Sequence, residues 1–190
     1  MSIEKFKVGC KVVHPDHGAG SIKSVSEENF FGFSKTYLII EFFSTGSVVK
    51  IPVDEVLNGN IPLREVLPRN ILEEKLKLLG QDVGVFKESY QRYLLDVKSG
   101  SIDKLIEVIN ELWFKRTKRQ LHSRENKLLK EAINLLASEI SIAFDVMQDE
   151  ARSMILQAVG ASEEDAENLF DTTLKNARGI KWVLKENASS

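Results

Sequence analysis

The sequence has no run of about 18 apolar residues free of charge, which is the length that a membrane-spanning helix requires. Its first residues, MSIEKFKVG, contain no uninterrupted apolar stretch of the kind found in export signals. A single cysteine, Cys10, excludes an internal disulfide and agrees with a reducing compartment. We therefore expect a cytoplasmic protein that has no membrane association.

Proline is scarce and confined to the first third of the chain. All four prolines precede Arg69, and none occurs between that residue and Ser190. Short segments rich in Val, Ile, Phe and Tyr predict strands in the proline-containing part, at residues 11–13, 21–25, 36–43 and 47–53. Ser44-Thr45-Gly46 predicts a hairpin turn between the last two. A small, twisted, barrel-like sheet is expected for residues 1–67.

The part without proline, residues 68–190, has the apolar spacing of helices. Helices are predicted near 66–79 and 85–97, then after N-caps at Ser101, Ser123, Asp145 and Ser162. Trp113 shares an apolar stripe with Ile102, Ile106 and Ile109, which places it in the core. The fold class predicted for the whole chain is therefore α+β, with an N-terminal small β-barrel followed by a C-terminal all-α helical bundle.

The stretch FKVGCKVVHPDHGAG places Cys10, His14, Asp16 and His17 within a few positions, a density that suggests a metal site. A closed zinc site needs about four ligands, usually in paired units from two segments, and such units are missing here. Pro15, Gly18 and Gly20 describe a tight turn between strands instead. No P-loop and no nucleophile elbow occurs. We therefore expect no metal, no cofactor and no enzymatic activity.

The net charge of −2 conceals two opposed segments. Residues 115–130 hold seven basic side chains and one acid, and residues 145–171 hold eight acids and one arginine. A basic segment of this kind either binds a polyanion or forms a solvated helix end, and the sequence leaves both readings open.

Two blocks of the chain occur in a characteristic order. The first is the run FKVG followed by VVHPDHGAG and a hairpin ending in VVKIPV; the second is KSG followed by a helix through Leu112-Trp113 and a capped turn into KLL. Together they resemble the CarD/CdnL family of bacterial transcription regulators. The resemblance covers residues 6–144. It implies a Tudor-like domain that binds the RNA polymerase β subunit. It also implies a helical domain that meets promoter DNA at the upstream edge of the melted bubble and stabilises the open complex, largely without reading sequence. A monomer is expected.

The resemblance also implies site residues. Lys50, with Val49 and Ile51, falls where relatives contact polymerase, whereas Glu28 stands where relatives can carry Arg. Phe86 falls where well-known members place a tryptophan wedge, and a cap on the bundle core is the other reading of Phe86. The further residues predicted to bind DNA are Lys87, Tyr90, Arg92, Lys115, Arg116, Lys118 and Arg119. Because the sequence departs from the family near Phe86, an adaptor that binds polymerase without significant DNA contact remains the alternative.

Overall fold

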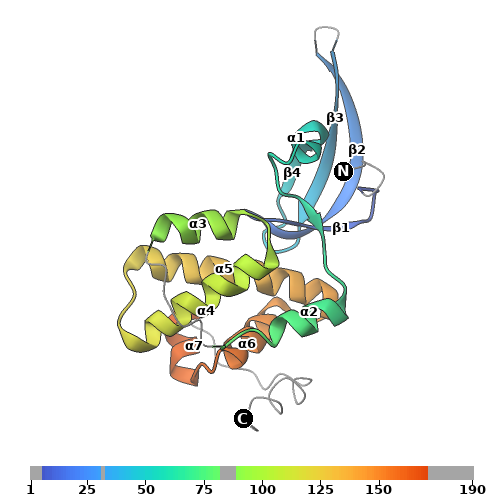
Figure 1. Cartoon of the computed structure of the whole chain (residues 1–190). Helices are drawn as coiled ribbons and strands as arrows, with labels where there is room; N and C mark the ends of the chain where they lie inside the picture. The colour runs from blue at the N-terminus through green and yellow to red at the C-terminus, as the bar shows by residue number, and fades with distance from the viewer. Residues whose placement is uncertain (1–5, 31–32, 82–88, 171–190) are drawn as a thin grey trace. The chain divides into compact units, whose positions relative to one another are not determined.

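The computed structural model describes residues 6–30, 33–81 and 89–170, and the chain divides into two compact units, Met1–Val66 and Leu67–Ser190. Each unit has its own hydrophobic core. The first is built on a sheet and the second on helices, so the α+β fold class is confirmed (Figure 1).

Five strands form one antiparallel sheet in the first unit, in the order β4-β3-β2-β1-β5. The strands are β1 (Lys11–His14), β2 (Gly18–Phe30), β3 (Phe33–Phe42), β4 (Val48–Pro52) and β5 (Arg64–Glu65), and a short helix, α1 (Val53–Leu57), follows β4. A barrel requires its first and last strands to pair. In the described part of the chain β4 and β5 are the two edges, so the sheet does not close and the predicted barrel is not confirmed.

The β2–β3 hairpin is longer than the strands that the sequence predicts. Its register runs from Gly20 opposite Phe42 to Phe30 opposite Phe33, with an irregularity between Ile22 and Ser24. Strand β4 pairs with β3 only between Tyr37 and Glu41, so β2 and β3 continue past it as a two-stranded arm (Figure 1). The core of the unit lies under the paired part, where Ile22, Leu38, Ile40 and Phe42 are fully buried.

Two glycines at the start of β2, Gly18 and Gly20, explain why this segment is rich in glycine. Gly18 has φ +77°, a conformation that a side chain disfavours. Gly20 faces β3 so closely that a Cβ there would lie 2.7 Å from the carbonyl oxygen of Glu41. The glycines therefore meet the geometric needs of the hairpin, as the sequence predicts.

Helices α2 to α7 make up the second unit. They are α2 (Arg69–Leu76), α3 (Tyr90–Lys98), α4 (Ile102–Lys118), α5 (Ser123–Phe144), α6 (Gln148–Ala158) and α7 (Glu163–Phe170). Helix α5 packs against α4 and α6, and α3 packs against α4. Trp113 is buried in this core, as its apolar stripe predicts. None of the described helices is long and apolar enough to cross a membrane.

Two of the four predicted N-caps are confirmed. The Ser101 hydroxyl accepts a hydrogen bond from the Lys104 backbone N–H at 3.5 Å. Ser162 and Asp165 bond each other's backbone N–H groups at the start of α7, which forms a capping box.

The other two N-cap predictions are wrong. His122, not Ser123, precedes α5, and its backbone N–H donates to Glu125 Oε2 at 3.0 Å. Asp145 ends α5 in a left-handed conformation with φ 56°, and α6 begins after Met147. Asp tolerates the left-handed conformation better than most residues. An Asp at a helix boundary can therefore end one helix as well as begin the next.

Candidate functional site

Strand β4 is the first candidate surface. Among the described strands it pairs only with β3, so its outer backbone edge lies at the border of the sheet. An extended segment of another protein can add to such an edge through backbone hydrogen bonds.

The three predicted polymerase-binding residues lie on this strand but differ in exposure. Ile51 is only 3% exposed and Val49 packs against the same core, so both side chains stabilise the fold. Only the backbone groups of these two residues are available to a partner. Lys50 points to the opposite face, where its ammonium group lies 4.3 Å from the centroid of the Tyr37 ring. It also donates a hydrogen bond to the carboxylate of Glu28 on β2. Glu28 is thus the ion-pair partner of Lys50.

The second candidate surface lies in the helical unit, where the sequence predicts DNA contacts. Phe86 and Lys87 fall outside the described residues. Tyr90 is half-buried at the start of α3, and the guanidinium of Arg124 lies 4.9 Å from its ring centroid. This contact joins the first turns of α3 and α5.

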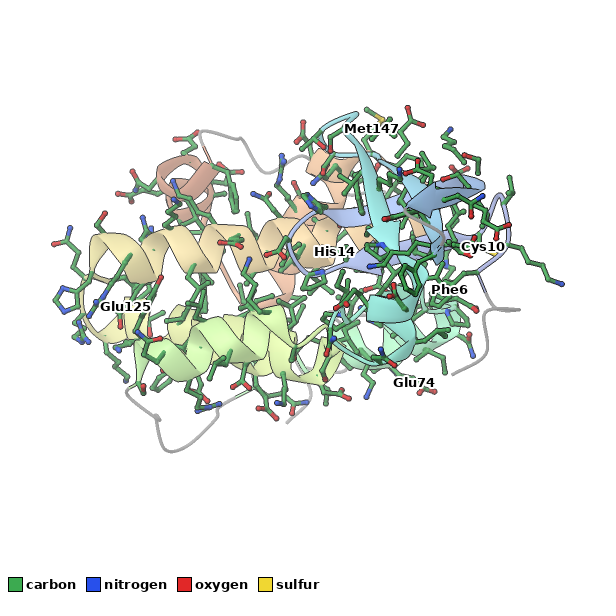
Figure 2. All side chains as sticks on the ribbon, turned by 90° about the horizontal axis from the view of Figure 1, so that it is seen from above. Phe6, Cys10, His14, Glu74, Glu125 and Met147 are labelled. Carbon is green, nitrogen blue, oxygen red and sulfur yellow. The ribbon has the colours of Figure 1, made fainter. Side chains whose placement is uncertain are left out.

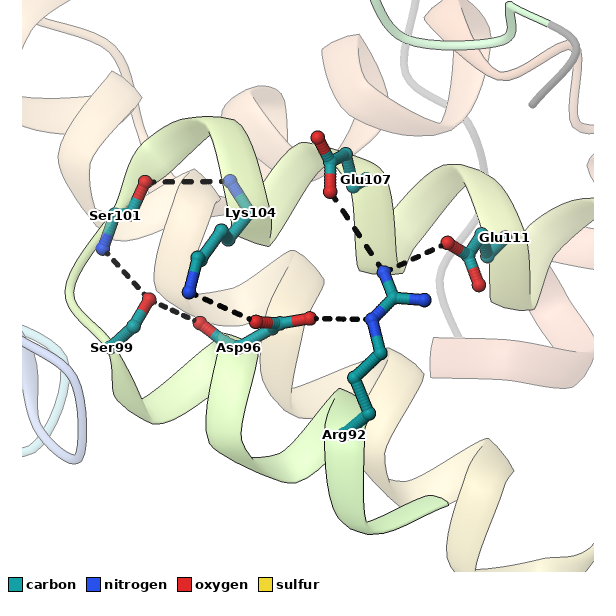
Figure 3. A network of polar contacts seen from close by, with 7 residues as sticks. All are labelled: Arg92, Asp96, Ser99, Ser101, Lys104, Glu107 and Glu111. Carbon is teal, nitrogen blue, oxygen red and sulfur yellow. Dashed lines mark hydrogen bonds and ion pairs between the residues drawn. The ribbon is translucent and has the colours of Figure 1, made fainter. Parts of the chain in front are cut away.

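Arg92 is engaged inside the protein. Its guanidinium donates to Asp96 and to Glu111, each at 3.0 Å, and lies 3.9 Å from Glu107 (Figure 3). Lys104 reaches the other oxygen of Asp96 at 3.2 Å. Arg92 therefore fastens α3 to α4.

Lys115 is also engaged internally. Its side chain is 8% exposed and donates to Glu125 Oε1 at 2.6 Å, and the Glu125 side chain is 6% exposed. Figure 2 shows Glu125 at the first turn of α5. Tyr93 lies nearby, with its ring centroid 5.9 Å from the Lys115 ammonium group. Lys115 thus acts as a buried link between α4 and α5.

Protonation follows from this packing. Burial alone raises the pKa of Glu125, but the bonds from Lys115 and from the His122 N–H, with the charge of Arg119, outweigh burial and hold that pKa below its ordinary value. Burial raises the pKa of the Tyr93 hydroxyl, and the Glu111 carboxylate raises it further. At neutral pH Glu125 is therefore ionised and Tyr93 is neutral.

The remaining predicted cations lie where α4 ends. Arg116 is partly buried and contacts Asn126 at 3.4 Å and Asp165 at 3.7 Å. Lys118 is exposed, with its ammonium group 4.9 Å from the Phe114 ring centroid, and Arg119 is exposed beside it.

Two residues that sequence reasoning did not assign to the site extend this surface. Arg124 and Lys127 are exposed in the first turns of α5 and, with His122 and Ser123, line an open depression of about 560 Å³. Both residues belong to the basic segment 115–130, but neither falls at a position that the family resemblance assigns to DNA binding. We call the four exposed cations Lys118, Arg119, Arg124 and Lys127 the basic turn.

The histidines of the β1–β2 turn have structural partners. His14 is buried, its Nδ1 accepts a hydrogen bond from the Asp16 N–H at 3.1 Å, and its ring lies 4.9 Å from that of His17. The His17 ring in turn lies 4.8 Å from Phe42. Among residues 6–30, 33–81 and 89–170, no three His, Cys, Asp or Glu side chains are grouped to hold a metal ion.

Comparisons with known proteins match both units. The family model of the CarD-like/TRCF RID domain matches residues 6–66, and that of the CarD C-terminal domain matches residues 79–156. These domains define the class as transcription regulators that interact with RNA polymerase. The chain belongs to the CarD/CdnL family. It is 27% identical over 155 residues to the Bacillus subtilis (strain 168) protein named "Putative transcription factor YdeB", covering 78% of this chain and 98% of that protein.

Proposed function

We propose that the chain binds the RNA polymerase β subunit through the edge of β4 and stabilises the promoter open complex. The helical unit contacts DNA at the upstream edge of the melted bubble. The first unit acts as a Tudor-like docking module, although its described strands form an open sheet. The protein works in the cytoplasm as a monomer, without a cofactor or an active site.

The observation that carries the DNA part of this proposal is the basic turn. Four exposed cations gather around one short connection, between helices that lie within the matched CarD C-terminal domain. Lys and Arg side chains on one surface bind phosphates without reading bases, and this binding weakens steeply with salt. The contact we propose is therefore largely independent of sequence.

Arg92 and Lys115 are predicted from sequence to contact DNA, but both form ion pairs inside the protein. The proposed DNA contacts therefore fall to other basic residues. Arg92 and Lys115 both form ion pairs with buried acids, so the basic turn, with Arg116 at its border, becomes the proposed phosphate-binding surface. Tyr90 is positioned at the edge of this surface by Arg124. The internal pairing of Arg92 and Lys115 also favours the second candidate, an adaptor without significant DNA contact, because it leaves fewer cations for DNA.

The deciding experiment neutralises two cations of the basic turn. We expect Lys118→Gln/Arg119→Gln to weaken polymerase-dependent retention on promoter DNA and to lower the salt slope of binding by about two, since each lost phosphate contact removes roughly one unit. The matched control is Arg69→Gln/Lys77→Gln, which removes two exposed cations from α2 and its end. Equal behaviour of both variants and the wild-type chain on DNA, with polymerase binding intact, would favour the adaptor.

Phe86 requires its own test, because its two readings predict different losses. As a wedge, Phe86→Ala shortens open-complex lifetime by the loss of base stacking, about 1–3 kcal/mol, and leaves thermal stability unchanged. As a core cap, the same variant costs about 3–5 kcal/mol of stability through a cavity. Phe86→Trp prolongs the lifetime in the first case and overpacks the core in the second. Melting temperature and open-complex lifetime, measured on both variants, separate the readings.

A further inference from the structure

Helix α7 brings an acidic surface to the basic end of α4. It lies beyond residues 79–156, the segment that the CarD C-terminal model matches. Its first turn contains Glu163, Glu164 and Asp165, and Glu167 follows. Ala166 and Leu169, both fully buried, anchor the helix in the core of the unit. The acids are therefore held at a fixed place on the surface.

One ion pair joins the two charge clusters. Asp165 Oδ1 lies 3.7 Å from Nη2 of Arg116, whose other terminal nitrogen donates to Asn126 on α5 at 3.4 Å. Together with Gln120, Leu121 and Asn168, these residues line a cavity of about 460 Å³. Gln120 and Leu121 belong to the connection between α4 and α5 that the basic turn surrounds. The acidic helix thus lies next to the proposed phosphate-binding surface.

We propose that α7 is a built-in competitor of DNA, which occupies Arg116 and lowers the positive potential of the basic turn. This regulation rests on the proposed DNA contact of the helical unit. DNA phosphates and the acids of α7 are both anions, so each favours a position beside the same cations. When a phosphate approaches, it must outcompete Asp165 for Arg116 and overcome repulsion from Glu163, Glu164 and Glu167.

The charge state of Asp165 agrees with this role. Hydrogen bonds from Ser162, above all from its hydroxyl, and the charge and bonding of Arg116 outweigh burial and hold the pKa of Asp165 below its ordinary value. Asp165 is therefore ionised at neutral pH. The contact is also accessible, because the side chains of Arg116 and Asp165 are 20% and 38% exposed.

The strength of the competition follows from Coulomb's law. Charges about 10 Å apart in water interact by about 0.4 kcal/mol, which is roughly twofold in affinity for each acid. Three neutralised acids would change DNA affinity about eightfold without screening, and about fourfold at about 20 mM salt, where the screening length is roughly 20 Å. At about 500 mM salt the screening length falls well below this separation, and the change should vanish.

The test uses the full-length chain and a fluorescent promoter-fork duplex, without polymerase. Truncation of α7 would expose the core around Leu169, so the acids are neutralised instead by Glu163→Gln/Glu164→Gln/Glu167→Gln, three surface changes in α7. Asp165→Asn, made alone, removes the ion pair with Arg116. The control variant, Asp54→Asn/Glu65→Gln/Glu74→Gln, makes the same change in net charge at exposed positions outside α7.

We expect both α7 variants to bind the fork more tightly than the wild-type chain at low salt, and the control variant to change affinity less than twofold. Equal gains in the α7 and control variants would show a general charge effect and overturn the proposal. Unchanged affinity of the α7 variants, while Lys118→Gln/Arg119→Gln weakens binding, would overturn the competition and leave the DNA contact standing. If no variant, including Lys118→Gln/Arg119→Gln, alters binding, the proposed DNA contact itself fails.

Discussion

Lys50 and Lys115 were both predicted to contact a partner, and the structure places them in opposite surroundings. Lys50 lies on the edge strand of the first unit with its side chain 39% exposed, paired with Glu28, which is 36% exposed. Lys115 lies between helices of the second unit, and both it and its partner Glu125 are less than a tenth exposed. An exposed ion pair exchanges readily with water or with another partner, whereas a buried pair holds two desolvated charges against each other.

The helical unit itself contains both buried and exposed cations. Arg92 and Lys115 face the contacts between α3, α4 and α5, while Lys118 at the end of α4 and Arg119, the residue that follows the helix, lie on the surface. Net charge in a sequence segment therefore overstates the charge available to a polyanion. In the basic segment 115–130, at least one lysine serves stability.

The largest effect is expected from breaking the buried pair. Lys115→Met should lower the free energy of unfolding by about 3–5 kcal/mol, because Glu125 is left buried without its cation. The double variant Lys115→Met/Glu125→Leu should recover most of this loss, since both charges are then absent. Urea unfolding of the variants and of Lys118→Met, a surface control, measures the difference. A loss in Lys115→Met no greater than in the surface control would contradict the buried role.

A smaller effect, on binding, is expected at the edge strand. Lys50→Glu should weaken binding to the isolated polymerase β-subunit lobe by about 1–2 kcal/mol, roughly tenfold, through lost charge complementarity with the partner. Stability should change little, because exposed ion pairs contribute less than about 1 kcal/mol. Calorimetric titration and thermal melts check the two parts. Lys35→Glu, an exposed lysine of β3, is the matched control, and binding by Lys50→Glu equal to wild type would remove Lys50 from the interface.

The sequence was sufficient for the elements whose signals are local. Segments rich in Val, Ile, Phe and Tyr and the Ser44-Thr45-Gly46 turn predicted β1 to β4, and the Ser101 cap and the stripe containing Trp113 predicted α4. Strand β5 is two residues long and carries no such pattern. The role of Asp145 could not be predicted from its side chain alone, because Asp suits both the start and the end of a helix. Its place at the end of α5 depends on the helices around it.

The burial of Lys115 could not be predicted from the stripe on α4. That stripe, through Ile102, Ile109 and Trp113, marks one face, but α4 packs against α2, α3 and α5 and is buried on a wider arc. Glu111 and Lys115, one turn apart, lie on this second face and find partners on α3 and α5. Only the tertiary arrangement supplies those partners.

The buried carboxylate of Glu125 should also make the stability of the protein depend on pH. The pKa of Glu125 is lowered in the folded protein, so its contribution to stability is complete above the unfolded value of 4.5 and is lost as pH falls through the folded value. The wild-type chain should therefore lose more stability below pH 4.5 than Lys115→Met/Glu125→Leu. Urea unfolding at a series of acidic pH values compares the two. Parallel stability curves would mean that Glu125 has the same pKa folded and unfolded.

The smallest effect is expected at the exposed ion pair between Lys50 and Glu28. Glu28→Gln removes the carboxylate that Lys50 bonds while keeping a polar side chain of the same length. If the pair is exchangeable, freeing Lys50 should strengthen binding to the β-subunit lobe by about twofold, because binding no longer has to displace an ion-pair partner worth less than about 1 kcal/mol. The gain should disappear in Lys50→Met/Glu28→Gln, compared with Lys50→Met alone. Glu27→Gln, the neighbouring acid on β2, controls for charge. Weaker binding by Glu28→Gln would instead mean that Glu28 holds Lys50 in the geometry that polymerase recognises, and that this exposed pair is as structural as the buried one.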